Sequence, residues 1–220
     1  MKYLLYIISF LFLVSCQQED FPTIGEGIGY LSLEDIQIQA AEVEMVQTRA
    51  VDNDLYVEIW QDGSLYDNHK YTPRTVPAKI ELPAGTYTLK VYNMETYADG
   101  KPWYYGEQEF TIAEGGVNYL SYEVPLKNFG VKLQLPEGFE ELFHDITFTV
   151  GEDVELDDGD VYYFAPNTES ISYTLKAKNE ANEDQISKGN SEDWENATLT
   201  TGKLYIITYS FETKALVLVP

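Results

Sequence analysis

Few residues in this chain have the type and spacing that catalysis requires. The two histidines, His69 and His144, belong to no HExxH-type or paired motif, and neither has a cysteine or a second histidine near it. No Gly-x-Ser-x-Gly segment occurs, so a serine hydrolase of that type is not expected. The 37 acidic residues are too numerous for one pair to stand out as general acid and base. The sequence therefore predicts no enzyme, no metal centre and no cofactor.

One acidic segment, residues 152–160, has oxygen ligands of the kind that calcium prefers. Asp157, Asp158 and Asp160 surround Gly159, which permits a sharp turn. The segment lacks the spacing of an EF-hand loop, and no matching ligand set occurs elsewhere. A turn between two strands is the favoured interpretation, and calcium binding stays open.

Three consecutive aromatic residues, Trp103, Tyr104 and Tyr105, follow a polar loop at 94–101. Aromatic rings on loops can stack on sugars, because they present an apolar face with a polar edge. We therefore consider these residues as possible glycan contacts. The favoured alternative is that they pack between loop and sheet as part of a core. Trp60 and Trp194 are isolated in the sequence and add no further argument.

The single cysteine, Cys16, ends a short apolar N-terminus. One positive charge at Lys2 precedes an apolar run from Tyr3 to Val14, which is the pattern of a secretory signal peptide. The run is shorter than the ~20 residues that a membrane-spanning helix needs. The segment Leu-Val-Ser-Cys at 13–16 resembles a bacterial lipobox, in which the signal is removed before the cysteine and the cysteine is acylated. The alternative is an ordinary signal peptide that contains a cysteine.

The residues that follow the cysteine are polar and acidic: Gln17, Gln18, Glu19 and Asp20. This stretch resembles the export signal that carries Bacteroidetes lipoproteins to the outer face of the outer membrane. A merely polar tether is the alternative. We expect a lipid-anchored protein of the outer membrane that faces the extracellular side.

Composition limits the partners and the fold class. The formal net charge of −23 disfavours nucleic acid and anionic membrane surfaces, because both would be repelled. Eighteen tyrosines, together with Val, Ile and Thr, favour strands. With one cysteine the chain can form no internal disulfide, so its stability must come from packed cores.

Alternation of apolar and polar residues is the dominant pattern along the chain. It predicts strands at 29–33, 36–38, 55–60, 86–92, 106–112, 118–124, 129–135, 146–150, 161–165, 171–178, 203–210 and 215–219. The polar stretch at 178–195 is predicted to be a long exposed loop.

The pattern restarts after Pro125, which cannot donate to a sheet ladder. We expect an all-β protein of two tandem β-sandwich domains: a signal peptide at 1–15, an acylated cysteine and acidic tether at 16–27, and sandwiches at 28–125 and 126–220. A duplicated module is one interpretation, because Leu-x-x-Gly-x-apolar occurs at 82–87 and again at 199–204.

Several segments together resemble one known family. They are Leu-Pro-Ala-Gly-Thr-Tyr-Thr-Leu at 82–89, Pro-Trp-Tyr-Tyr-Gly at 102–106, Gly-Tyr-Leu-Ser-Leu at 29–33 and the junction at 124–131. The chain resembles Bacteroidetes lipoproteins with the uncharacterised domain DUF4493. More distantly, it is similar to fimbrillin-type pilus subunits and anchors. The resemblance implies transthyretin- or fimbrillin-like sandwiches and supplies no enzymatic activity.

Two functions remain open at this stage. The first is a structural or adhesive surface lipoprotein, with fimbrial subunits or other surface proteins as partners, acting as a fimbria-associated anchor or cap. The alternative is a glycan-binding lipoprotein of a nutrient-uptake system. In fimbrillin-type systems, polymerising subunits are cleaved after an arginine near the N-terminus. Arg49 lies in a polar stretch suited to such processing. An ordinary loop is the favoured interpretation, and we expect the uncleaved, anchored form.

Overall fold

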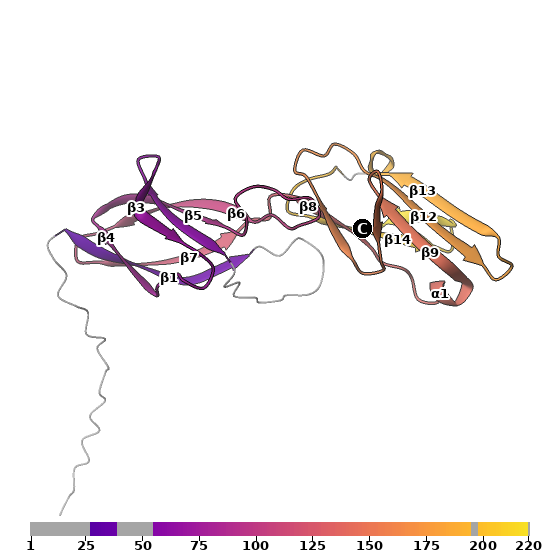
Figure 1. Ribbon diagram of the computed structural model, residues 1–220, viewed down its shortest axis with the longest axis horizontal. Coiled ribbons are helices and arrows are strands. Elements are labelled where there is room, and N and C mark those ends of the chain that lie inside the picture. Colours follow the sequence, from indigo (N-terminus) through magenta and orange to yellow (C-terminus); the bar gives the residue numbers. More distant parts are fainter. Residues whose placement is uncertain (1–26, 39–54, 195–197, 220) are drawn as a thin grey trace, which may run out of the picture.

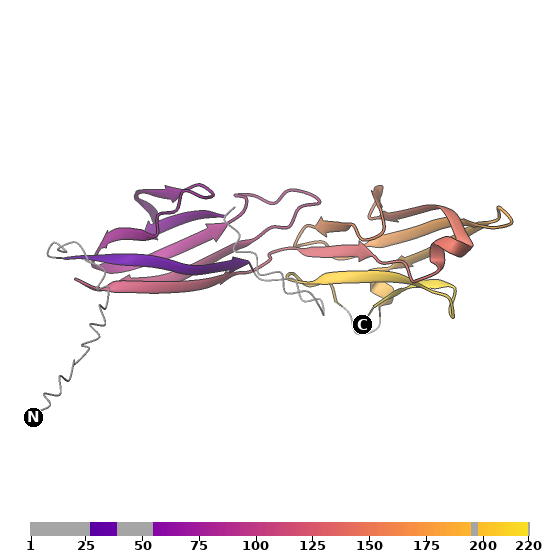
Figure 2. The same ribbon diagram turned by 90° about the horizontal axis from the view of Figure 1, so that it is seen from below.

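The computed structural model describes residues 27–38, 55–194 and 198–219. They form two β-sandwiches that lie end to end, so the molecule is elongated (Figures 1 and 2). The expected all-β fold with two tandem sandwiches is confirmed. No helix among the described residues is long and apolar enough to cross a membrane. Cys16, Gln17 to Asp20 and Arg49 lie outside the described residues.

The N-terminal sandwich packs a three-stranded sheet against a four-stranded one. The first has the order β4-β1-β7, with β4 at Lys79–Pro83, β1 at Ile28–Ile38 and β7 at Val117–Val124. The second has the order β3-β2-β5-β6, with β3 at Ser64–Tyr71, β2 at Tyr56–Gln61, β5 at Gly85–Tyr92 and β6 at Tyr105–Ile112. Strand β1 runs parallel to β7 and antiparallel to β4.

The C-terminal sandwich has two four-stranded sheets. One has the order β11-β8-β14-β15, with β11 at Val161–Phe164, β8 at Phe129–Leu133, β14 at Leu204–Ser210 and β15 at Ala215–Leu218. The other has the order β10-β9-β12-β13, with β10 at Val154–Leu156, β9 at Phe143–Val150, β12 at Ser172–Asn179 and β13 at Asp184–Asn190. A short helix α1, Phe139–Leu142, and a 3₁₀ turn, Ser191–Asp193, complete the sandwich.

Each sandwich has its own apolar core, built by alternation along the strands. In β4, Ile80 and Leu82 are buried while their neighbours are exposed, and β14 buries Tyr205, Ile207 and Tyr209 between half-buried neighbours. Since side chains of a strand point alternately to its two faces, the buried set marks the face toward the core. The two buried clusters share no residue.

The two sandwiches repeat one topology. Strands β1 to β7 correspond in order to β8 to β14. The sheet order β4-β1-β7 matches β11-β8-β14, and the sheet order β3-β2-β5-β6 matches β10-β9-β12-β13. The strand directions agree as well: the first and seventh strands of each set are parallel, and the other named pairs are antiparallel. Strand β15 is an addition to the second set.

The sequence match that suggested a duplication joins strands that are not equivalent. It aligns Gly85, at the start of β5, with Gly202, just before β14. In the repeated topology β5 corresponds to β12, and β14 corresponds to β7. A glycine turn before an alternating strand is common in β-proteins. The sequence match at 82–87 and 199–204 therefore does not align the two repeats correctly.

The prediction of one long loop at 178–195 was also wrong. Residues Asp184–Asn190 form β13, which pairs antiparallel with β12 along its length. Strand β13 lies at the edge of its sheet, and its apolar residue Ile186 is 58% exposed. An edge strand held mainly by backbone pairing needs no apolar alternation. Its composition therefore resembles that of a loop.

The connection between the sandwiches is held by Asn128, which is fully buried. Its Oδ1 accepts a hydrogen bond from the Trp103 N–H at 3.0 Å, and its Nδ2 donates to the Lys101 carbonyl at 2.9 Å. Its own carbonyl accepts from the Gly202 N–H at 2.8 Å. One side chain thus joins a loop of the first sandwich to the chain that enters the second.

A second set of contacts lies beside this junction. The Tyr97 hydroxyl and the Gly100 N–H both donate to the carbonyl of Tyr163 in β11, at 3.0 and 3.1 Å. A Cβ at Gly100 would lie 2.9 Å from the Tyr162 ring, and the glycine has φ +74°. Only a glycine lets the loop approach β11 this closely.

We expect Asn128→Ala to lower the free energy of unfolding by about 2–4 kcal/mol, because it removes a fully buried side chain and takes away the partners of the part-buried Trp103 backbone N–H and Lys101 carbonyl. Urea denaturation followed by tryptophan fluorescence measures the change. Asn118→Ala is the matched control: its amide donates one hydrogen bond, to the Thr111 carbonyl, at an exposed position. Equal effects of the two substitutions would contradict the role of Asn128.

Candidate functional site

The outer face of the β3-β2-β5-β6 sheet carries an unusual set of side chains. In β2, Val57 and Ile59 belong to the core cluster, so alternation turns Tyr56, Glu58 and Trp60 to the opposite face. In β5 the same rule turns Lys90 and Tyr92 outward. The side chains form rows across the sheet, because strand register places them directly opposite one another.

The first row consists of tyrosines. Tyr56 of β2 pairs with Tyr92 of β5, which pairs with Tyr105 of β6. The rings of Tyr56 and Tyr92 stack at 5.3 Å with an interplanar angle of 8°, and those of Tyr92 and Tyr105 stack at 6.1 Å and 26°. Tyr92 is only 3% exposed, because its neighbours cover it on both sides.

The second row alternates in charge. Lys70 of β3 pairs with Glu58 of β2, Glu58 pairs with Lys90 of β5, and Lys90 pairs with Glu107 of β6. Lys70 Nζ lies 3.0 Å from Glu58 Oε1, and Lys90 Nζ lies 3.2 Å from Glu107 Oε1. Lys70 also reaches Glu95 at 2.6 Å. Opposite charges on neighbouring strands stabilise the pairing.

The tips of the aromatic side chains point to this charged row. The Tyr92 hydroxyl and Trp60 Nε1 both donate to the Glu58 carboxylate at 2.7 Å, and the Tyr105 hydroxyl donates to Glu107. Lys90 Nζ lies 3.8 Å from the centroid of the Trp60 ring, a cation–π contact. The rings are therefore held in fixed positions at the surface.

The aromatic set continues toward the junction of the sandwiches. The Trp103 ring lies 6.3 Å from Tyr105 and 6.5 Å from Tyr97, measured between centroids. Trp103 Nε1 donates to the Met94 carbonyl at 3.2 Å. A row of rings thus extends from the sheet to the loop that contacts β11.

A shallow, open depression of about 260 Å³ lies in this face. Its lining consists of Glu58, Trp60, Lys90, Tyr92, Glu95 and Tyr105. We call these six residues, with Tyr56, Lys70, Trp103 and Glu107, the aromatic face. It offers apolar ring surface and carboxylate acceptors side by side, which suits a ligand with apolar C–H and polar O–H groups.

The pKa values of the face follow from these contacts. Burial raises the pKa of Glu58, but the hydrogen bonds from Tyr92, Lys70 and Trp60 outweigh it and hold that pKa below its usual range. The hydrogen bond from Tyr105, with help from Lys90, lowers the pKa of Glu107. Burial and the carboxylate partners raise the pKa of Tyr92 and of Tyr105 to about 12.

Two of the three aromatic residues singled out in the sequence lie on this face, Trp103 and Tyr105. Tyr104 packs against the N-terminal core instead, because consecutive residues of a strand point to opposite sides. Sequence reasoning missed Tyr56, Glu58, Trp60, Lys90 and Tyr92. The alternation of the two strands contains the signal, but their pairing is needed to bring the residues together.

The two histidines lie apart from the aromatic face and serve local structure. His69 Nδ1 donates to the Tyr66 carbonyl at 2.9 Å, and its ring contacts Tyr66 and Tyr71. His144 lies 3.6 Å from Asp145, which also pairs with Lys178 at 3.2 Å. Neither arrangement has the partners of a nucleophile or a metal site.

The acidic segment at 152–160 contains β10 and a turn. The Asp158 carboxylate accepts from the Leu135 N–H at 2.7 Å, and the Gly159 N–H donates to the Leu133 carbonyl at 3.0 Å. The turn is thus fastened to the end of β8. Among the described residues, no three His, Cys, Asp or Glu side chains form a group that could hold a metal ion.

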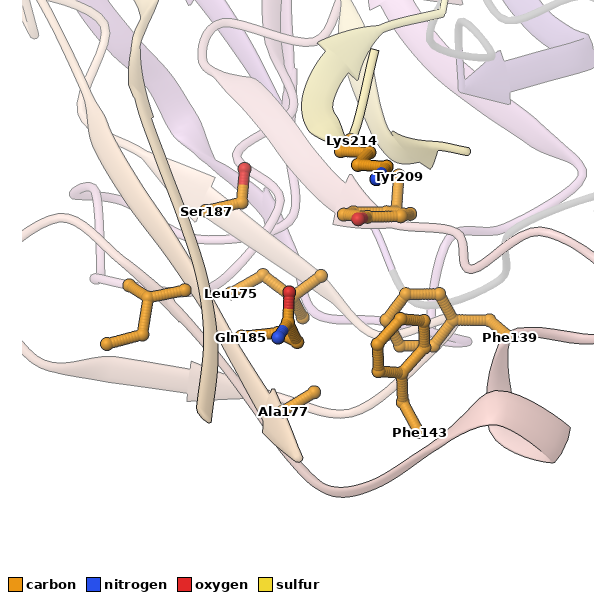
Figure 3. Close-up of a pocket in the computed structure, with 9 residues that line it drawn as sticks. Phe139, Phe143, Leu175, Ala177, Gln185, Ser187, Tyr209 and Lys214 are labelled. Atoms are coloured by element: carbon orange, nitrogen blue, oxygen red, sulfur yellow. The ribbon is translucent and has the colours of Figure 1, made fainter. Parts of the chain in front are cut away.

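A second depression lies in the C-terminal sandwich, where Phe139, Phe143 and Tyr209 face Gln185 and Ser187 of β13 (Figure 3). The rings of Phe139 and Phe143 stack at 4.6 Å. The remaining cavity is about 20 Å³, which is room for roughly one water molecule. This site is too small for a ligand.

We expect the stability of the protein to be highest between about pH 5 and pH 10. Glu58 and Glu107 have lowered pKa values, so they contribute stability above about pH 4.5 that is lost as the pH falls through their folded-state pKa. Tyr92 and Tyr105 have raised pKa values, so their contribution is lost as the pH rises from about 10 toward 12. Urea denaturation across this pH range measures the loss of unfolding free energy at the acidic and at the alkaline end.

Glu58→Gln should lower the free energy of unfolding by about 1–3 kcal/mol at pH 7, because it weakens three hydrogen bonds to a charged group. The difference from wild type should shrink below about pH 4.5. Glu109→Gln, exposed on β6, is the control and should change little. If Glu58→Gln lowered the free energy of unfolding equally at pH 7 and below pH 4.5, the stabilising role of the ionised Glu58 carboxylate would be contradicted.

Comparisons with known proteins identify a family and a shared fold. The model of the family "Domain of unknown function (DUF4493)" matches residues 27–217. Comparison with curated proteins gives no significant match. Among solved structures, a "putative cell adhesion protein" from Bacteroides uniformis ATCC 8492 has 13% identity and a TM-score of 0.54, covering 88% of this chain and 97% of its own.

Two further structures have lower TM-scores. A "putative cell adhesion protein" from Bacteroides eggerthii DSM 20697 has 10% identity and a TM-score of 0.46, with coverage of 83% and 85%. "Putative polysaccharide binding proteins (DUF1812)" from Bacteroides thetaiotaomicron VPI-5482 have 12% identity and a TM-score of 0.43, with coverage of 86% and 95%. At 13% identity, the likeness to the B. uniformis protein shows a shared fold and no more. The family match spans nearly all of both sandwiches and confirms the resemblance seen in the sequence: the chain belongs to the DUF4493 family.

Proposed function

We propose that this protein is a lipid-anchored adhesion protein of the cell surface that binds carbohydrate through the aromatic face. The observation that carries the proposal is the pair of cross-strand rows, tyrosines beside alternating charges, on one exposed sheet face. Buried cores explain the inward residues of these strands. They do not explain why the outward ones are aromatic and charged.

The chemistry of the face fits a sugar better than other partners. A sugar ring has apolar C–H faces that pack on Trp60 or Tyr105, and hydroxyls that donate to Glu95 and Glu107. The net charge of −23 repels nucleic acid and anionic lipid. No arrangement for catalysis accompanies the face among the described residues, so we propose binding without turnover.

The anchor in this proposal is Cys16, preceded by the lipobox and followed by Gln17, Gln18, Glu19 and Asp20. Acylation would hold the chain in the outer membrane, and the acidic stretch would direct it to the outer face. More than one acyl chain gives stable anchoring, since each buried methylene contributes ~0.8 kcal/mol. The elongated pair of sandwiches would then project from the surface (Figure 2).

More specifically, we propose that the protein acts as a fimbria-associated anchor or cap. Processing after Arg49 would remove β1, which lies between β4 and β7 and buries Leu31 completely. The loss would leave two strands with unpaired backbone groups and an open core, a costly state without a partner strand. We therefore propose that the anchored form keeps β1 and remains uncleaved.

Binding is tested with the mature protein on an array of plant, bacterial and mucin glycans. We expect wild type to bind a subset, and Trp60→Ala with Tyr105→Ala to weaken binding about tenfold or more, because each ring contact contributes ~1 kcal/mol. Tyr119→Ala, 56% exposed on β7 of the other sheet, is the matched control and should bind like wild type. Absence of any binding by wild type would refute the proposal.

Anchoring is tested by metabolic labelling with a clickable fatty acid. The wild-type protein should be labelled, and Cys16→Ser should be unlabelled and keep its signal peptide. Labelling that persists in Cys16→Ser would overturn the assignment of the lipid to this residue. The intact mass of protein from native membranes should place the N-terminus at acylated Cys16, whereas an N-terminus at Ala50 would show that processing removes the anchor.

A further inference from the structure

The charges of the aromatic face restrict the ligand that it can bind. Both cations are already paired: Lys70 contacts Glu58 at 3.0 Å and Glu95 at 2.6 Å, and Lys90 contacts Glu107 at 3.2 Å and the Trp60 ring at 3.8 Å. Three carboxylates of the face thus stand against these two ammonium groups, and a third cation, Lys127, acts on Glu107 from beside the face. A sugar acid or sulfated sugar would add a further negative charge beside Glu95 and Glu107, where Lys70 and Lys90 are already paired with carboxylates.

The hydrogen-bonding groups restrict it further. The hydroxyls of Tyr92 and Tyr105 and the indole N–H of Trp60 donate to carboxylates of the face itself, and the indole N–H of Trp103 donates to the Met94 carbonyl. The partly exposed carboxylates, each with about four lone-pair sites, supply most of the remaining capacity as acceptors, beside the other N–H groups of Lys90 and the Tyr56 hydroxyl. A partner with many O–H groups, which donate to the carboxylates and can also accept, matches this set.

The size of the face indicates the length of the ligand. The depression of about 260 Å³ is smaller than the ~300–1,000 Å³ of pockets that enclose a whole small molecule. The rings extend beyond it, through Trp103 to Tyr97, at centroid spacings of 6.3 and 6.5 Å. A single sugar would cover one part of this row. A chain of sugars would contact all of it.

We infer that the aromatic face binds a neutral oligosaccharide that lies across β2, β5 and β6 from Trp60 to Trp103. The inference rests on the proposed function and specifies its ligand class. Neutral sugar units supply the O–H donors that Glu95 and Glu107 accept, and their apolar faces lie on Trp60, Tyr105 and Trp103. Carboxylated or sulfated chains of equal length would place further negative charge beside Glu95 and Glu107, which weakens their binding.

Calorimetric titration of the mature protein tests this inference. The neutral probes are cellotetraose, xylotetraose, maltotetraose and mannotetraose, each with its disaccharide and monosaccharide. The acidic probes are tetragalacturonic acid and a heparin tetrasaccharide. At least one neutral tetrasaccharide should bind about tenfold or more tightly than its monosaccharide, and both acidic probes should fail to bind at low and at high salt.

Trp103→Ala should weaken the tetrasaccharide about tenfold and leave the disaccharide unchanged. Because the Trp103 ring also packs near the junction, Trp103→Leu keeps its apolar bulk and should lose the same affinity. Tyr119→Ala is the control. Thermal unfolding confirms that each variant is folded.

The outcomes separate the two proposals. Preferred binding of an acidic tetrasaccharide overturns the ligand class and leaves carbohydrate binding intact. Equal affinities for monosaccharide and tetrasaccharide, or an unchanged affinity in both Trp103 variants, overturn the extended mode. Failure of all probes here and of the glycan array overturns carbohydrate binding itself.

Discussion

The arrangement of the aromatic face depends on one carboxylate, that of Glu58. It lies on the outer side of β2, between core residues Val57 and Ile59, and is only 7% exposed. Burying a charge is costly unless it is paired and hydrogen-bonded. Here Tyr92, Trp60 and Lys70 satisfy it together. Because the three partners come from β5, β2 and β3, the need to satisfy Glu58 fixes side chains across three strands.

This fixation determines what the surface can do. A tyrosine or tryptophan ring that rotates freely loses conformational entropy when a ligand stops it, and the loss weakens binding. Tyr92 cannot rotate freely, since Tyr56 and Tyr105 lie against its faces and Glu58 holds its hydroxyl. Trp60 is held by Glu58 at its nitrogen and by Lys90 at its ring. The rings are thus positioned before any ligand arrives.

The sequence predicts the fold well where each strand buries a face. Alternation located β1, β2, β5 and β12 closely, because their inward residues are apolar. It failed for four strands at sheet edges: β3 and β13, which have a polar composition, and the short strands β4 and β10. The candidate site was harder to predict. Trp103 and Tyr105 stand out as neighbours in the sequence, but Glu58, Lys90 and Glu107 meet only through strand register, which a single sequence does not display.

The internal repeat provides a test of what the fold alone requires. In the C-terminal sandwich, β9 and β12 hold the places of β2 and β5. Their inward residues are again large and apolar, as in Phe148, Val150 and Leu175. Their outward residues are small or simply charged: Thr149 lies beside Thr174, and Lys176 is exposed. The same topology therefore folds without a row of tyrosines or a buried carboxylate. The scaffold does not need the rows on the N-terminal sandwich, and this is why the proposed carbohydrate site is placed there and not on the second sandwich.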